Sequence, residues 1–169
     1  HPVIHMLKRN FRIEEEDTEG TIAKKIERAV LFLGEDLRPI VPHLRYLMSV
    51  DPGDPAVLTM DPQQRRGEIF DALRRLLVRA SEVRPQVFVN EDVHWMDKAT
   101  EESLLASADS VPTNRILQIL TYRPGYTHPF GERSYHHRIA LTTLSAEDSV
   151  QMAHAVLGTE SLPEDLKSL

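Results

Sequence analysis

Apolar residues in the first half of the chain recur three or four positions apart, which is the spacing that places side chains on one face of an α-helix. The pattern predicts helices over residues 3–11, 22–33, 37–48 and 62–83. Gly34 should end the second helix, and Pro42 should limit or kink the third. Asp61 is a good N-cap for the fourth helix, Pro62 suits its first position, and Pro85 disfavours its continuation.

Beyond Pro85 the pattern changes to short apolar runs that are rich in β-branched and aromatic residues. Residues 87–89 form a run of this kind, which is typical of a strand that is buried on both faces, and residues 116–120 are an apolar run that predicts a second buried strand. A helix predicted over residues 98–108 joins them, so the two strands are expected to be parallel neighbours in one sheet. Residues 138–141 are a candidate third strand.

The last part of the chain returns to helical spacing. Ser145 and Asp148 resemble a capping box that opens a helix, and Gly158 is placed to end it. Residues 162–165 look like the start of a further helix. The order of elements therefore predicts an α/β protein with a mainly parallel sheet, preceded by a helical segment.

Composition narrows the functional classes. The chain has 169 residues and a formal net charge of −6, so a general affinity for nucleic-acid backbones is not expected. These residues include no cysteine, which excludes a disulfide scaffold, a thiolate metal site and a cysteine nucleophile within them. No apolar stretch approaches the roughly 20 residues that span a bilayer, and the start does not resemble a signal peptide. Because the first residue is not methionine, the chain is interpreted as a fragment or a processed form of a longer protein. A cytoplasmic location is expected for it.

Two adjacent carboxylates follow closely on the first predicted strand. Ligands of open α/β sheets bind beyond the carboxyl ends of the strands, so Glu91 and Asp92 point at the expected site. Magnesium prefers oxygen ligands and usually takes one or two carboxylates together with waters and substrate phosphates. A second carboxylate beside the ion can orient or deprotonate an attacking water. The same pair also fits a plain acidic cap on a strand, and the pair alone does not decide between the two.

A basic residue stands just after the second predicted strand. Arg123 would lie beside the same crevice, where it can contact a terminal phosphate and sense whether that phosphate is present. An arginine after a strand is commonly a solvated surface residue. The nucleotide-site hypothesis therefore depends on the combination of both strand ends.

Aromatic residues and histidines nearby admit more than one interpretation. His94 is a candidate phosphate contact or proton relay, but a histidine in a turn is more often structural. Trp95, the single tryptophan, is predicted to anchor the following helix against the sheet. The pair His136 and His137, with His128 nearby, suggests zinc. Adjacent residues of a strand point to opposite faces, and no cysteine supports the pair, so zinc binding is not favoured.

Residues 91–97, Glu-Asp-Val-His-Trp-Met-Asp, resemble the hydrophobic–Glu-Asp-x-His-Trp-x-Asp Walker B segment of multidomain signalling ATPases. These are the STAND-type relatives of AAA ATPases, and many are fused to a class III adenylate/guanylate cyclase domain and to tetratricopeptide repeats. Residues 121–125, Thr-Tyr-Arg-Pro-Gly, are similar to the end of that family's sensor 1 strand. Residues 139–148 are similar to its L-x-x-L-S-x-E-D passage from strand to helix. The resemblance covers most of the chain and is clearest from Asp61 onward.

The resemblance implies an AAA-like P-loop NTPase core that binds ATP or ADP with Mg²⁺. Glu91 would face magnesium, Asp92 would handle the water, and Arg123 would be the phosphate sensor. Both carboxylates are candidate magnesium ligands, directly or through water. Three domains are expected. Residues 1–60 form a helical segment, residues 61–158 form the Walker B and sensor 1 part of the core, and residues 159–169 start a further helical region.

Two departures from the family pattern bear on activity. The Walker A loop, G-x-x-x-x-G-K-[ST], is absent from these residues and is expected upstream of His1. Without its backbone amides and lysine a triphosphate has no cradle, so the chain alone is expected not to hydrolyse ATP. Asn90 stands where an apolar residue is usual before the acidic pair. A buried asparagine needs hydrogen-bond partners, which puts the regularity of that strand end in question.

The leading functional hypothesis is an ATPase switch module inside a larger signalling protein, with attached domains such as a cyclase or tetratricopeptide repeats as partners. One alternative is a non-hydrolysing scaffold whose helical first half binds partner proteins. Another is the ATPase core of a transcription regulator, which a helix-turn-helix downstream would reveal. An intact phosphate-binding loop upstream would favour the switch over the scaffold. None of these hypotheses assigns this segment to nucleic acid or to a membrane.

Overall fold

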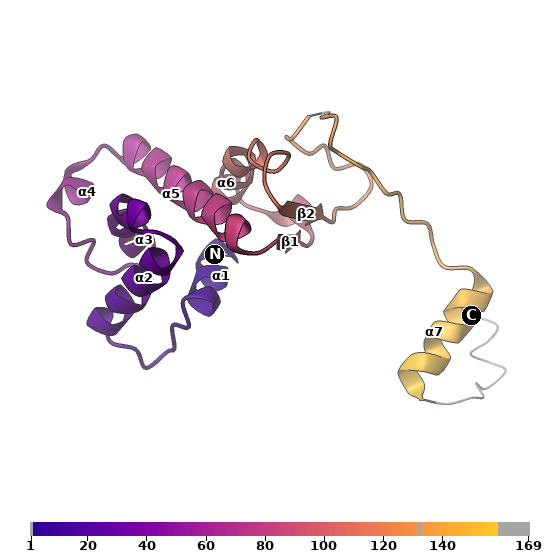
Figure 1. Cartoon of the computed structure of the whole chain (residues 1–169). Helices are drawn as coiled ribbons and strands as arrows, with labels where there is room; N and C mark the ends of the chain where they lie inside the picture. Colours follow the sequence, from indigo (N-terminus) through magenta and orange to yellow (C-terminus); the bar gives the residue numbers. More distant parts are fainter. Residues whose placement is uncertain (1, 132, 159–169) are drawn as a thin grey trace. The chain divides into compact units, whose positions relative to one another are not determined.

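The computed structural model of the chain describes residues 2–131 and 133–158 (Figure 1). It separates into two units, His1–Arg133 and Ser134–Leu169. The described secondary structure is mixed, with helices in the majority and one small parallel sheet, which agrees with the α/β class at a coarse level.

The first part of the chain is helical, as the spacing of its apolar residues predicts. Its elements are α1 (Pro2–Asn10), α2 (Glu19–Leu33), the 3₁₀ helix η1 (Glu35–Ile40), α3 (Val41–Leu47), α4 (Pro55–Thr59) and α5 (Pro62–Val83). Asp61 caps α5 through its carboxylate, which accepts hydrogen bonds from the backbone N–H groups of Gln63 and Gln64. Helix α5 ends at Val83, before Pro85, as expected.

The single helix predicted over residues 37–48 is wrong in detail, because the segment forms two helices. The 3₁₀ turn η1 contains Pro39, and α3 starts at Val41 with Pro42 in its first turn. Proline lacks the N–H group that an α-helix interior needs, so Pro42 is tolerated where a helix begins and not in the middle of one.

A hydrophobic core holds the helices together. Side chains of α1, α2, η1, α3 and α5 contribute to it, and its members are Leu7, Phe11, Ile26, Val30, Leu37, Ile40, Val41, Leu44, Met48, Val50 and Ala72. Ile26, Val30 and Leu44 have no exposed surface, so α2 and α3 provide its centre. Burial of this apolar surface is the main stabilising contribution to the unit.

The sheet consists of two parallel strands, β1 (Gln86–Asn90) and β2 (Ile116–Leu120). Helix α6 (Lys98–Ala108) connects them, so they form the predicted strand–helix–strand unit. The register pairs Gln86 with Ile116 and Asn90 with Leu120. The prediction that residues 87–90 and 116–120 are neighbouring parallel strands is therefore confirmed.

The prediction that residues 87–89 are buried on both faces, with residues 116–120 as a second buried strand, is wrong for one face of the sheet. Val87 and Val89 of β1 are 60% and 56% exposed, and their register partners Leu117 and Ile119 are 56% and 41% exposed. Alternate residues of a strand point to opposite faces, so these four side chains share one face of the sheet. Within the residues that the structure describes, that face lacks the helical cover typical of parallel sheets.

The candidate third strand at residues 138–141 does not form. Its apolar residues Ile139 and Leu141 are 82% and 89% exposed, and the segment is coil. An isolated extended segment has no ladder of hydrogen bonds to stabilise it. The following helix α7 (Ala146–Leu157) forms as predicted, because Ser145 accepts a hydrogen bond from the Asp148 N–H. The predicted helix start at residues 162–165 lies outside the described residues.

Candidate functional site

The acidic pair lies immediately beyond β1. Asn90 is a regular member of the strand, since it pairs with Leu120 and its carbonyl accepts a hydrogen bond from Thr121 N–H at 3.0 Å. The question that Asn90 raised about the strand end is therefore settled in favour of a regular strand. Glu91 and Asp92 follow, and both are exposed.

Asp92 adopts a left-handed backbone conformation, with φ of 53° and ψ of 42°. Such a conformation is uncommon for residues other than glycine, although aspartate tolerates it better than most. It turns the chain sharply from β1 into the short 3₁₀ helix η2 (Val93–Trp95) and places Val93 inside, where it is 3% exposed.

Thr121, the first residue after β2, ties the two strand ends together. Its N–H donates to Asn90, its carbonyl oxygen accepts from Val93 N–H at 2.9 Å, and its side-chain Oγ1 accepts from Asp92 N–H at 2.9 Å. Sequence reasoning did not single out this residue. One feature of the sequence could have identified it: a hydroxyl side chain directly follows the second predicted strand, and the acidic pair closely follows the first.

Arg123 leaves β2 at the same end of the sheet as the carboxylates. It begins a turn in which Tyr126 N–H donates to the Arg123 carbonyl oxygen at 3.3 Å, and Gly125 supplies the positive φ of 88°. The Arg123 side chain is exposed, and among the described residues it makes no ion pair. Its guanidinium is therefore available to an anionic ligand.

His94 is packed against aromatic rings behind the acidic pair. Its side chain is 11% exposed, and its ring lies 5.2 Å from that of Trp95 and 6.4 Å from that of Tyr126. Burial raises the pKa of the Tyr126 phenol, with a smaller contribution from the charge of Glu101. Both His94 ring nitrogens are buried without a hydrogen-bond partner among the described residues, and Nδ1 lies 3.9 Å from Asp92 Oδ1.

The prediction that Trp95 anchors the following helix against the sheet is wrong. Trp95 is 75% exposed, because the turn of η2 directs Val93 inward and leaves Trp95 on the surface. Helix α6 is fixed instead by Asp97, whose Oδ1 accepts a hydrogen bond of 2.7 Å from Thr100 N–H. Hydrogen bonds from Thr100 hold the pKa of the Asp97 carboxyl below its ordinary value.

The chemistry of the two carboxylates fits a magnesium ion shared with a substrate. Glu91 and Asp92 offer hard oxygen donors on the surface, and Mg²⁺ commonly takes one or two such ligands with waters and phosphates completing its shell. Within the part of the chain that the structure describes, no three His, Cys, Asp or Glu side chains gather closely enough to hold a metal by themselves. An all-protein metal cage therefore does not fit these residues.

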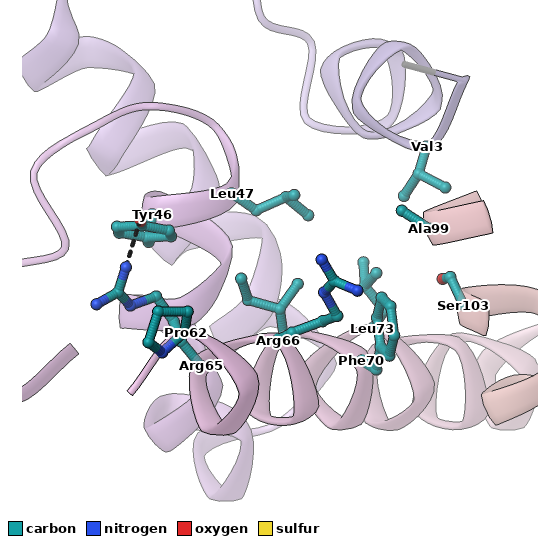
Figure 2. Close-up of a pocket in the computed structure, with 11 residues that line it drawn as sticks. Val3, Tyr46, Leu47, Pro62, Arg65, Arg66, Phe70, Leu73, Ala99 and Ser103 are labelled. Atoms are coloured by element: carbon teal, nitrogen blue, oxygen red, sulfur yellow. Dashed lines mark hydrogen bonds between the residues drawn. The ribbon is translucent and has the colours of Figure 1, made fainter. Parts of the chain in front are cut away.

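A cavity of about 270 Å³ lies among helices α1, α3, α5 and α6 (Figure 2). Its walls are largely apolar, and none of Glu91, Asp92, His94 and Arg123 lines it. Figure 2 shows Arg65 reaching the hydroxyl of Tyr46 at one side of the cavity.

Comparison with known proteins assigns no family to the chain, because no protein-family model and no solved structure matches it. A segment of 89 residues, 53% of the chain, is 29% identical to the uncharacterized protein R02095 of Rhizobium meliloti (strain 1021). The match spans 9% of the length of that protein. No helix in the described ranges is both long and apolar enough to cross a bilayer.

Proposed function

We propose that this chain is the Walker B and sensor 1 part of an ATP-hydrolysing switch domain in a larger signalling protein. The observation that carries the proposal is the parallel pairing of β1 and β2, which brings Glu91, Asp92 and Arg123 to one end of the sheet. In open α/β sheets that end is where ligands bind. The limited share of R02095 that the match covers also supports a place within a longer polypeptide.

In this proposal each exposed side chain has one chemical task. Asp92 accepts a hydrogen bond from the attacking water and takes up its proton as the water attacks the terminal phosphate. Glu91 offers a carboxylate ligand for Mg²⁺, which when bound neutralises part of the phosphate charge. Arg123 donates charge-assisted hydrogen bonds to the terminal phosphate, and its exposed guanidinium is suited to that contact.

His94 is the candidate second contact to the ligand. Its two buried nitrogens lack partners among the described residues, and an unsatisfied buried polar group costs roughly 1–3 kcal/mol. A hydrogen bond from one ring N–H to a bound phosphate or to its coordinated water would lower that cost, and it requires the buried ring to move toward the ligand. The close packing of the ring against Trp95 and Tyr126 supports a structural role as well.

The first test measures nucleotide binding by the 169-residue chain. The proposal requires a phosphate-binding loop that these residues do not contain, and two carboxylates repel a triphosphate unless cations compensate. Calorimetry with ATP and Mg²⁺ should therefore detect no binding up to about 1 mM. Micromolar affinity would show that the nucleotide site lies elsewhere in the chain.

The second test measures turnover by the longer protein that contains the loop. Asp92→Asn should lower the turnover rate by about 10²–10⁴ while nucleotide affinity stays nearly the same, because an amide is a far poorer base. Arg123→Ala should weaken the preference for ATP over ADP. Asp109→Asn is the matched control, since Asp109 is 78% exposed and lies outside the site. Turnover by Asp92→Asn at the unmodified rate would remove the catalytic role.

A non-hydrolysing scaffold is the second candidate function. The observation that favours it is the apolar cavity of about 270 Å³ in the helical part, which is open to an apolar side chain of a partner (Figure 2). Two results together would favour the scaffold over the switch. The longer protein would show no ATP turnover, and Ile69→Asp in the cavity wall would abolish the binding of a partner.

A further inference from the structure

We propose that Thr121 is a positioning residue for Asp92, so that its hydroxyl sets the direction of the carboxylate that handles the water. The inference rests on the proposed function, because Asp92 acts on a water there. It concerns a residue with no assigned role in the nucleotide site. Thr121 acts through the main chain of Asp92 and touches neither ATP nor the reacting water in this proposal.

The geometry separates the task of the Thr121 side chain from that of its backbone. The Thr121 N–H and carbonyl oxygen bond to Asn90 and Val93, and these contacts continue the ladder between β1 and β2. The Thr121 Oγ1 alone accepts the N–H of Asp92, at 2.9 Å. Loss of the hydroxyl therefore frees one backbone group, that of Asp92, and leaves both flanking contacts in place.

The backbone of Asp92 needs such a restraint. A residue with a Cβ at φ of 53° is at a sterically unfavourable position, and it persists where the surroundings determine it. Without this restraint the φ angle of Asp92 would vary more widely about its value, and the direction of the side chain would vary with it, while the Val93 N–H bond to the Thr121 carbonyl oxygen remains. The carboxylate of Asp92 would then no longer point consistently to one place, while its charge and exposure would remain the same.

The same hydrogen bond links the two halves of the site. Thr121 stands two positions before Arg123, so any shift of the β2 end on contact with a phosphate would also move the hydroxyl that holds the Asp92 amide. Precise placement of a catalytic group is worth a great deal, since a displacement of about 1 Å can cost up to about 10²-fold in rate. The expected consequence is a defect in turnover and not in binding.

The experiment compares Thr121→Val, which keeps the shape but removes the acceptor, with Thr121→Ser, which keeps the acceptor. Thr142→Val is the control, because Thr142 is exposed in the second unit and belongs to no part of the site. Amide hydrogen exchange of Asp92 and Val93 is measured by NMR on the 169-residue chain. The kcat and the KM for ATP are measured on the longer protein.

In Thr121→Val the Asp92 amide should exchange about two- to tenfold faster, as for the loss of one exposed hydrogen bond, whereas the Val93 amide stays protected. The kcat should fall between about tenfold and 10²-fold with an unchanged KM. Thr121→Ser should restore both the exchange rate and kcat, and Thr142→Val should change neither.

The two arms distinguish the ways in which the inference can fail. An Asp92 amide that exchanges equally in Thr121→Val and the unmodified chain would overturn the hydrogen bond as a restraint. A freed Asp92 amide with unchanged kcat would overturn the positioning role while the proposed function stands. A faster Asp92 amide in the 169-residue Thr121→Val chain, together with a longer protein that does not hydrolyse ATP, would overturn the proposed function and the catalytic meaning of Thr121 with it.

Discussion

At the scale of single residues, Arg65 shows how one side chain fixes a connection between helices. Its Nε donates to the carbonyl oxygen of Val57 at 2.8 Å, and its Nη2 donates to the carbonyl oxygens of Leu58 and Met60. Its Nη1 reaches the hydroxyl of Tyr46 at 2.7 Å, and the guanidinium also lies 4.7 Å from the centre of that ring. The planar fork of arginine satisfies helix-end carbonyls that would otherwise lack partners.

We predict that Arg65→Lys lowers the free energy of unfolding by about 2 kcal/mol, because an ammonium group cannot reach these acceptors together and cannot stack on Tyr46 in the same way. Arg66→Lys is the matched control. Arg66 is 58% exposed and forms an ion pair with Glu102. Arg66→Lys should therefore lower the free energy of unfolding by less than about 0.5 kcal/mol. Urea denaturation of both variants checks the difference, and equal midpoints would contradict the role of Arg65.

Sequence alone placed Glu91, Asp92 and Arg123 at one end of the sheet, because that step needs only strand positions and parallel pairing. It did not reveal Thr121 or the exposure of Trp95. Both follow from the left-handed backbone at Asp92, which sends Val93 inward. An aspartate adopts that conformation only where neighbours determine it, so the direction of these side chains is a tertiary property.

At the scale of elements, helix starts were the features that local sequence determined best. Asp61, Asp97 and Ser145 each accept a hydrogen bond from a backbone N–H in the first turn of the helix that follows. An N-cap depends on neighbouring residues only, which is why local patterns identify it. Helix α4 was missed although Asp54 caps it, because its five residues are too few to show helical spacing.

We predict that the cap on α6 makes stability sensitive to acid. Hydrogen bonds from Thr100 lower the pKa of Asp97 in the folded chain below its ordinary value of 3.8. The stabilisation is therefore complete above that ordinary value and is lost as the pH falls through the lower, folded-state pKa. Asp97→Asn keeps a capping oxygen that does not titrate. Its unfolding midpoint should fall less between about pH 6 and about pH 3 than that of the unmodified chain.

Equal slopes of unfolding midpoint against pH in the two proteins would contradict this role of Asp97. Asp17 contributes in the same direction in both proteins, since the bond from Lys25 Nζ at 2.5 Å and that from Glu14 N–H lower its pKa. The difference between the two slopes therefore isolates Asp97.

The sequence did not predict which face of the sheet is exposed, and this exposure gives a second prediction at the scale of elements. Val89 and Val93 lie four residues apart, but Val89 is 56% exposed and Val93 is 3% exposed. Val93→Thr buries a hydroxyl and should lower the free energy of unfolding by about 1–3 kcal/mol. Val89→Thr keeps a β-branched side chain in a strand and should cost less than about 0.5 kcal/mol.

Chemical denaturation of these two variants tests whether the face of β1 that carries Val89 is exposed while Val93 of η2 is buried. A cost for Val89→Thr as large as that for Val93→Thr would mean that the exposed face of the sheet is buried in solution. Periodicity did not separate the two cases, because a short apolar run reads alike whether one or both of its faces are covered. What covers a strand depends on segments distant in sequence.

At the scale of the whole molecule, burial is concentrated in the first unit. Every fully buried hydrophobic residue among those described lies between Leu7 and Phe130. Helix α7 has no buried residue, and Met152 and Val156 are 58% and 76% exposed. The mixed helix and sheet composition followed from the sequence, whereas the division at residues 133 and 134 did not, because a boundary depends on which contacts form between distant segments.

This distribution predicts how the chain responds to truncation. Removal of residues 134–169 should leave the urea midpoint and the m-value of the main transition nearly unchanged, because among the described residues the buried apolar surface lies in the first unit. Removal of residues 1–18 is the contrasting variant. It takes away Leu7 and Phe11, which are 2% and 7% exposed, and loss of each such side chain from a core typically costs about 2–5 kcal/mol. A midpoint that falls as far on removal of residues 134–169 as on removal of residues 1–18 would show that the second unit is needed to stabilise the first.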